Sequence, residues 1–301
     1  MEKTESKRNN YIGISLAVIT TIIWSGNFII ARDVYQQIPP ISLAFYRWSL
    51  ASFVIFFIGY NKFISEKSIV IKNRRYFFWV ALTGITLFNT FIYVAGHTTT
   101  AINLALIGTT AAPIFAIIIS AIFLKEIITP LRIAGLLFCI AGVIYLLSKG
   151  SINTLLAFRF TAGDVWILLS AFVFSIYTVL VKRKSATISP ITFLFVIFIG
   201  GTLLLLPFFI TEQIIMPPVI WDAKLFGSIL YLGIGASVIS FFCWNAAIAR
   251  IGSVRTALFG NLIPIFSTLE AVWLLGETIT IVHLISGGLV IIGLMLANLK
   301  R

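Results

Sequence analysis

The chain has 301 residues, of which 59% are hydrophobic and 11% are charged, whereas a soluble globular domain is roughly half apolar and a quarter charged. This composition excludes an ordinary soluble domain and predicts an integral membrane protein. The formal net charge of +12 does not indicate nucleic-acid binding, because the basic residues are distributed as a membrane topology requires.

Ten apolar stretches are long enough to cross a hydrocarbon core of about 30 Å as helices, since each helical residue rises about 1.5 Å. They cover residues 12–31, 40–60, 76–96, 101–122, 131–149, 163–181, 189–210, 225–246, 254–275 and 282–299. A β-barrel would show short segments of alternating polarity, but runs such as FAIIISAIFL are apolar on every side. The sequence therefore predicts an all-α integral membrane protein with ten transmembrane helices.

The N-terminal segment MEKTESKRNNYIG is charged and leads into the first span without a small-residue cleavage site, so we expect the first helix to be retained. Seventeen of the 22 Lys and Arg residues lie in the N-terminal tail, the even-numbered loops and the C-terminus, and four lie on the opposite side. This asymmetry predicts that both termini are cytoplasmic. We expect a multi-pass protein of the plasma membrane, which in a bacterium is the inner membrane.

The two halves of the chain, residues 1–150 and 151–301, align at an offset of 150 to 151 residues. The phrase TTAAPIFAIIISAIFLKE at 109–126 returns as GNLIPIFSTLEAVWLLGE at 260–277. Each half holds five spans, and because five is odd the second half enters the membrane from the opposite side. Inverted repeats of this kind are typical of transporters that work by alternating access. A stable bundle or a channel without alternation is the alternative.

Four segments carry a resemblance to a known family: WSGNFIIAR in the first span, PPISLAFYRW at the second, AINLALIGTTAAPIFAIIISAIFLKEIIT at the fourth and GDVWILLSAFVFSIYTVLVKR at the sixth. They resemble the EamA-type branch of the drug/metabolite transporter (DMT) superfamily. The resemblance implies ten helices in two inverted EamA repeats, cytoplasmic termini, and movement of amino acids, related metabolites or drugs, often outward.

Polar and aromatic side chains that share a helix face are our candidates for substrate binding. Asn27 lies three residues after Trp24, and Tyr93 lies four after Asn89, so each pair shares one face. A face that combines polar groups with large rings suits an organic solute. The alternative is that these rings only fill the core. The candidates are Trp24, Asn27, Asn89, Tyr93, Tyr177, Trp244 and Asn261.

Two charged residues stand out because they lie well inside predicted spans, away from the span ends, and a charge costs at least about 2.5 to 3.5 kcal/mol at the bilayer centre. Arg47 matches an arginine that the resemblance places in the second helix, and it is predicted either to bind a substrate carboxylate or to act as an interhelical clamp. Glu270 is predicted either to carry a coupling proton or to pair with an arginine. Their counterparts in the other repeat are Ile197 and Ile119, so the repeats differ at both positions.

Pro113 and Pro264 occupy equivalent positions in the repeated phrase and are predicted to act as hinges, with a purely structural kink as the alternative. Glu126 and Glu277 end the two copies of the phrase. We expect these carboxylates to cap the start of the next helix, where the helix dipole favours a negative charge.

No metal or cofactor site is predicted, because neither His residue and neither Cys residue has partners at ligand spacing. No intramembrane enzyme is indicated either, since no span combines a nucleophile with a base or pairs two acids. The fifth and tenth spans are rich in glycine, which predicts close packing or a homodimer contact. The predicted function is a secondary transporter, with an exporter favoured, of amino acids or related small metabolites or drugs. Proton coupling and uncoupled facilitation both stay open.

Overall fold

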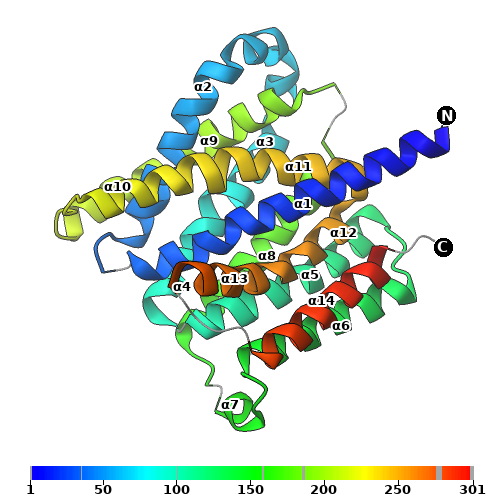
Figure 1. Cartoon of the computed structure of the whole chain (residues 1–301). Helices are drawn as coiled ribbons and strands as arrows, with labels where there is room; N and C mark the ends of the chain where they lie inside the picture. Colours follow the sequence, from blue (N-terminus) through cyan, green and yellow to red (C-terminus); the bar gives the residue numbers. More distant parts are fainter. Residues whose placement is uncertain are drawn as a thin grey trace.

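The computed structural model describes residues 2–34, 36–99, 101–157, 159–184, 187–275 and 280–298 (Figure 1). The first half of the chain forms one set of helices, and the π-helical segment η1 interrupts its third span. These elements are α1 (Glu2–Asp33), α2 (Pro40–Lys72), α3 (Arg74–Ala81), η1 (Leu82–Leu87), α4 (Phe88–Thr98), α5 (Ala101–Leu124) and α6 (Pro130–Leu147). Each predicted span of this half corresponds to one helix or, for the third, to a continuous run of three segments.

A short helix, α7 (Ile152–Leu156), connects the halves. The second half repeats the arrangement with a second π-helical segment, η2, and a short 3₁₀ turn, η3. Its elements are α8 (Ala162–Lys182), α9 (Pro190–Ile215), α10 (Ala223–Leu230), η2 (Tyr231–Ile239), α11 (Ser240–Ile251), α12 (Ser253–Leu258), η3 (Phe259–Leu262), α13 (Ile263–Leu275) and α14 (Ile281–Asn298).

The all-helical architecture is confirmed over the described residues. Eight helices of this part of the chain are long and apolar enough to cross a membrane. The two remaining predicted spans fall on α1 and on α12 to α13, so the total of ten stays a prediction. The start of α1 and the end of α14 lie at the same side of the molecule (Figure 1), which agrees with an even number of crossings.

Proline sets the start of three long helices. Pro40, Pro130 and Pro190 each occupy the first position of α2, α6 and α9. Proline suits this position because its missing N–H would have no partner there and its fixed φ is already helical. Pro40 and Pro190 are equivalent in the repeat, so the same residue begins the second helix of each half.

The helices α2 and α9 pack together along their length, and each caps the other with a glutamate. Glu212 of α9 accepts hydrogen bonds from the backbone N–H groups of Ile41 (3.2 Å) and Ser42 (2.6 Å) and from the Ser42 hydroxyl (2.7 Å). Glu66 of α2 accepts from the N–H and the hydroxyl of Ser189, at 3.0 and 3.1 Å. Each carboxylate thus lies at a helix N-terminus, where the dipole favours it.

Glycine lets α6 and α14 approach closely, as expected for the fifth and tenth spans. A Cβ atom at Gly135 would collide with the backbone of Gly293, and the reverse is also true. In contrast, a Cβ at Gly287 or Gly288 would meet no atom within 4 Å. The packing part of the expectation is confirmed, and the homodimer contact stays a prediction.

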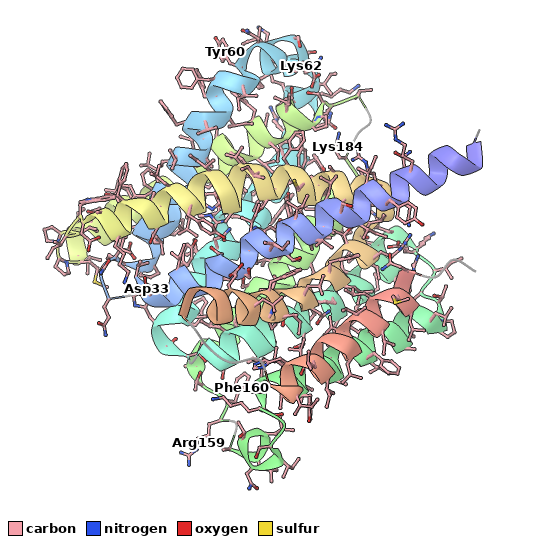
Figure 2. All side chains as sticks on the ribbon, viewed as in Figure 1. Asp33, Tyr60, Lys62, Arg159, Phe160 and Lys184 are labelled. Atoms are coloured by element: carbon pink, nitrogen blue, oxygen red, sulfur yellow. The ribbon has the colours of Figure 1, made fainter. Side chains whose placement is uncertain are left out.

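The outer surface is apolar between two charged ends. Large side chains such as Phe57, Ile122 and Leu137 are more than half exposed along the helices, as a lipid-facing surface requires. The distribution of Lys and Arg places Lys62 and Lys184 on the predicted cytoplasmic side and Arg159 on the opposite side. In Figure 2 the two lysines lie in the upper part of the view and Arg159 lies at the lower left, which agrees with this prediction.

Candidate substrate cavity

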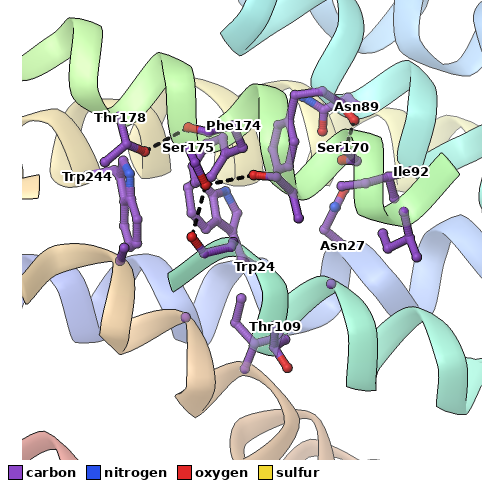
Figure 3. A pocket seen from close by; sticks show the side chains of 18 of the residues that line it. Trp24, Asn27, Asn89, Ile92, Thr109, Ser170, Phe174, Ser175, Thr178 and Trp244 are labelled. Atoms are coloured by element: carbon purple, nitrogen blue, oxygen red, sulfur yellow. Dashed lines mark hydrogen bonds between the residues drawn. The ribbon is translucent and has the colours of Figure 1, made fainter. Parts of the chain in front are cut away.

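A cavity lies between the two repeats and receives side chains from both (Figure 3). The first repeat contributes residues of α1, α2, α4 and α5, and the second contributes residues of α8, α11, α12, η3 and α13. The lining thus takes residues from the first, third, fourth, sixth, eighth and ninth spans, and α2 adds Arg47. The lining residues come from segments far apart in the sequence, so the cavity depends on the packing of one half against the other.

Aromatic rings form most of one wall. Trp24 contacts Phe174 edge to face, with ring centroids 5.5 Å apart, and its centroid lies 4.9 Å from that of Trp244. Phe88 stacks on Phe174 at 4.2 Å. Such rings provide a rigid apolar surface, and their edges and faces fix the mutual geometry. This wall suits the apolar part of a solute.

Arg47 lies at the polar end of the cavity and is 1% exposed. Its Nη1 donates to Asn27 Oδ1 (2.8 Å), Asn89 Oδ1 (2.8 Å) and the Tyr93 hydroxyl (2.7 Å). Its Nε donates to the hydroxyl of Ser237 at 2.6 Å. All of these acceptors are neutral, and no carboxylate of the described residues forms an ion pair with Arg47. The guanidinium therefore joins four helical segments and lies 5.1 Å from the ring centroid of Trp48, with no carboxylate of the described residues at ion-pair distance.

The π-helical segment η2 supplies a backbone acceptor to this end of the site. The carbonyl oxygen of Ala236 accepts from Arg47 Nη2 and from Trp24 Nε1, both at 2.9 Å. π-helical turns shift the usual hydrogen-bond pattern and are frequent at functional sites. The segments η1 and η2 lie at equivalent positions of the two repeats, with Gly84 and Gly235 aligned. A π-helical segment therefore interrupts the third span of both repeats.

Three hydroxyls of α8 line the cavity, and all of them donate to backbone carbonyls. Ser170 donates to Phe88 O (2.8 Å), and Thr178 donates to Phe174 O (2.9 Å). Ser175 is within reach of both Ala171 O and Ala112 O, and so connects α8 to α5 beside Pro113 (Figure 3). These hydroxyls offer the cavity only lone pairs, because their protons are already engaged.

The cavity is small. The space that water-sized molecules can reach inside it is about 60 Å³, which is room for a few waters at ~10–15 Å³ each. Binding of a solute of amino-acid size therefore needs the lining side chains or their helices to move apart.

The structure brings five of the predicted substrate-binding residues to the lining: Trp24, Asn27, Arg47, Asn89 and Trp244. Tyr93 lies behind them as a partner of Arg47. Tyr177 and Asn261 do not line the cavity. The substrate-binding role of all eight residues stays a prediction.

Tyr177 and Asn261 are both fully buried in packing positions. The Tyr177 hydroxyl donates to Asn245 Oδ1 at 2.6 Å, and its ring lies against Gly84. Asn261 Nδ2 donates to Leu258 O at 3.0 Å and holds the 3₁₀ turn before α13. Neither side chain reaches the cavity, because each faces a neighbouring helix or its own chain.

Glu270 lies outside the cavity lining and is partly buried. Its Oε1 accepts a hydrogen bond from the Ser25 hydroxyl at 2.5 Å. Among the described residues no ion pair joins it to Arg47. The two charged residues that break the repeat are therefore separate features, and the coupling role of Glu270 stays a prediction.

The two predicted hinges lie in different local settings. Pro113 is inside the continuous helix α5, whereas Pro264 is the second residue of α13, directly after η3. The helix break thus occurs in only one copy of the repeated phrase. Hinge motion at either proline stays a prediction.

The expected cap by Glu126 is wrong. Thr129 is the N-cap of α6, and its hydroxyl accepts from Arg132 N at 3.4 Å. Glu126 instead accepts from the Ser253 hydroxyl (3.2 Å) at the start of α12 and lies 3.8 Å from Arg132. Thr129 caps α6 because it directly precedes the helix, where a short side chain reaches the free N–H groups. Glu277 lies outside the described residues.

Sequence reasoning missed several contributors to the site. Ser170, Ser175 and Thr178 share one face of α8 by helical spacing, so that signal was available. The Ala236 carbonyl has no sequence signal, since it is a backbone group. The described residues contain no cluster of three or more His, Cys, Asp or Glu side chains that could hold a metal.

Comparison with known proteins gives the family. The profile of the EamA-like transporter family matches the chain twice, at residues 11–148 and 161–299. An uncharacterized transporter of Archaeoglobus fulgidus is 28% identical over 95% of this chain and 97% of its own length. A Salmonella typhimurium protein named "Probable amino-acid metabolite efflux pump" is 25% identical over 93% of this chain and 92% of its own.

A solved crystal structure shares the fold, with a TM-score of 0.75 and 20% identity over 97% of this chain and 96% of its own. Together with the apolar helices, these matches identify a multi-pass membrane protein with a transporter fold, not an enzyme. The repeated family match agrees with the internal repeat and with the resemblance seen in the sequence. The chain belongs to the EamA-like transporter family.

Proposed function

We propose that this protein is a secondary exporter of amino acids or related small metabolites. The observation that carries the proposal is the cavity itself, which lies between the repeats and combines an aromatic wall with a few fixed polar groups. Cavities with this mixture are typical of small-molecule sites. The name of the Salmonella relative supports outward movement of amino-acid metabolites.

Alternating access is the mechanism that we propose. Inverted repeats can exchange conformations, so that a cavity open to one side becomes the same cavity open to the other. The position of the cavity supports this idea, because both repeats line it and a movement of one repeat against the other would change the access to it. The π-helical segments in both repeats support it as well, since they are local irregularities beside the cavity.

We propose proton coupling through Glu270, with uncoupled facilitation as the alternative. Glu270 accepts a hydrogen bond from the hydroxyl of Ser25, and Ser25 directly follows the cavity residue Trp24 on α1. A change in its protonation would strengthen or release this contact between α13 and α1. That link would connect a proton to the packing of two cavity helices.

We further propose a plasma-membrane location with both termini in the cytoplasm, and contact between two copies through α6 and α14. The distribution of Lys and Arg supports the orientation. The unoccupied sides of Gly287 and Gly288 support the contact surface. Labelling of single cysteines placed at either end of α1, from outside intact cells, tests the orientation.

The experiment that tests the transport proposal has two stages. Cells that express the protein are first screened for resistance to toxic amino acids, metabolites and drugs. Purified protein in liposomes is then assayed for flux of the hits. We expect net movement of at least one hit down its gradient, and failure of every hit to move in liposomes would remove the transporter proposal.

Coupling is tested with an imposed pH gradient in the same liposomes. We expect wild-type protein to accumulate substrate against its gradient and Glu270→Gln to lose this accumulation while retaining downhill flux. Asp33→Asn is the matched control, because it removes an exposed carboxylate paired with Lys224, away from the cavity. If neither protein accumulates substrate, uncoupled facilitation is supported. If both accumulate it equally, the proton is coupled at another site.

A further inference from the structure

Two buried hydrogen-bond donors of the cavity have no partner among the described residues. Asn89 Nδ2 and Trp244 Nε1 are both unpaired in this part of the chain, and the residues are 0% and 1% exposed. Both residues line the cavity. Buried polar groups are nearly always paired, because an unmade hydrogen bond costs the full desolvation of the group. These two donors therefore need acceptors that the described residues do not supply.

The chemistry around Asn89 fixes which way its amide points. Arg47 can only donate, so the atom of Asn89 at 2.8 Å from Nη1 must be the amide oxygen. The NH₂ group then faces away from the guanidinium. This orientation follows from the partner, which removes the usual ambiguity between the two ends of an amide.

An unpaired donor alone does not make a site, as Trp48 shows. Its indole N–H is also unpaired, and its side chain is 0% exposed, but Trp48 does not line the cavity. Asn89 and Trp244 differ from it because they border free space. They also lie at opposite ends of that space, with Asn89 next to Asn27 and Trp244 next to Thr178 (Figure 3).

The charge of the cavity is the second, independent observation. Arg47 is buried at the end that holds Asn89, and it has no carboxylate partner among the described residues. The described lining residues include no Asp or Glu. A buried cation without a counter-ion favours the binding of a negative group and disfavours that of a positive one.

A free ammonium group finds only weak support in this site. The α8 hydroxyls can accept hydrogen bonds through their lone pairs, but they carry no charge to offset a cation. A zwitterion would leave the occupied site with a net charge of +1, whereas a monoanion would neutralise it. Charge thus separates two classes of substrate that hydrogen bonding alone does not.

We propose that the cavity selects organic monoanions: molecules with a carboxylate for Asn89 and Arg47, an apolar body for the aromatic wall, and a second acceptor for Trp244, without a free ammonium group. N-acylated amino acids and oxo acids have this chemistry. The inference depends on one part of the proposed function, namely that the substrate binds in this cavity. Binding and flux are therefore measured separately.

The test uses purified full-length protein in nanodiscs and calorimetric titration with three related compounds. N-acetylleucine is a monoanion with an extra carbonyl, leucine is a zwitterion, and leucinamide is a cation. We expect N-acetylleucine to bind about tenfold more tightly than leucine, as a charge-assisted contact predicts, and leucinamide to bind least. Equal or tighter binding of leucine or leucinamide, or no binding of N-acetylleucine, overturns the inference.

Variants locate the selection in the two donors. Asn89→Asp replaces the donor with a carboxylate beside Arg47, and we expect it to weaken N-acetylleucine binding about tenfold or more. Trp244→Phe removes an N–H and keeps a ring, so a smaller loss is expected. Trp79→Phe makes the same chemical change at an exposed position of α3 outside the cavity lining and should leave affinity unchanged. If Trp79→Phe and Trp244→Phe weaken binding equally, the indole donor of Trp244 has no special role.

Flux in liposomes separates this inference from the transport proposal. Binding of N-acetylleucine without flux would contradict transport and leave the anion selectivity intact. Flux of leucine in preference to N-acetylleucine would support transport and overturn the selectivity. The compound series needs no variant to fold, so it decides the question even if Asn89→Asp is unstable.

Discussion

The two repeats agree in their scaffold and differ in their charges. Both begin their second helix with a proline and interrupt their third with a π-helical segment. Only the first repeat places an arginine in its second helix, where the second repeat has Ile197. The arginine gathers acceptors from both halves at one end of the cavity. The difference teaches that the symmetric parts hold the helices, and that an asymmetric residue gives the cavity its polarity and its sign of charge.

The largest effect is expected from a variant that removes the charge difference between the repeats at position 47. Arg47→Met removes the donor to Asn89 Oδ1 and to the hydroxyl of Ser237 and one of two donors to Ala236 O, and we expect a loss of about 3 kcal/mol or more in stability. Substrate binding should be lost as well. The loss of stability is measured as a lower melting temperature of the purified protein in detergent.

Arg47→Lys separates the clamp from the charge. Lysine keeps the positive charge but cannot reproduce the planar fork that reaches several partners at once. We expect a melting temperature close to that of Arg47→Met, with anion binding partly retained. If the lysine variant is as stable as wild type, the clamp role of Arg47 is wrong.

A second prediction concerns two glycines at equivalent positions of the repeats, which differ in the space around them. A Cβ at Gly84 would overlap the ring of Tyr177, whereas a Cβ at Gly235 would lie 3.5 Å from its nearest neighbour, Ile23. We expect Gly84→Ala to cost about 1–3 kcal/mol through overpacking. Gly235→Ala should be neutral or slightly stabilising, because alanine favours helix over glycine. Equal melting temperatures of the two variants would contradict this asymmetry.

The smallest predicted effect concerns the glutamates that join α2 and α9. Glu212→Gln weakens three hydrogen bonds at the start of α2, and we expect a loss of about 0.5–2 kcal/mol, as for other helix caps. Glu66→Gln weakens two bonds at Ser189 and should cost less. Melting curves of both single variants and the double variant give the comparison. An increase in stability for either one would show that burial of the carboxylate costs more than its cap contributes.

Much of the fold was readable from the sequence because lipid imposes simple rules. Three features can be recognised in the sequence without any knowledge of packing. They are the apolar stretches of span length, the equivalent prolines Pro40 and Pro190, and the repeated phrase around Pro113. Five of eight candidate binding residues reached the cavity because helical spacing puts them on inward faces. Tyr177 and Asn261 did not, since an inward face also meets neighbouring helices, and spacing does not distinguish a neighbour from a cavity.

The sequence could not predict features that depend on three-dimensional packing. The Ala236 carbonyl accepts from Arg47 and lies in the π-helical segment η2, and the sequence carries no signal for such a backbone contact. Glu66 and Glu212 read as surface charges near helix ends, and only the antiparallel packing of α2 and α9 brings each to its partner. Long-range pairs of this kind need a register between helices, which a single sequence does not supply.

The paired glutamates also limit how the molecule can move. One contact lies at each end of α2 and α9, and in each the carboxylate comes from one helix and the backbone donor from the other. Sliding of the two helices along their common axis would break both contacts at once. A conformational change that keeps both must treat α2 and α9 as a strut of fixed register. The opening of the cavity would then take place where this strut meets α1, α4 and the segment α10 to α11.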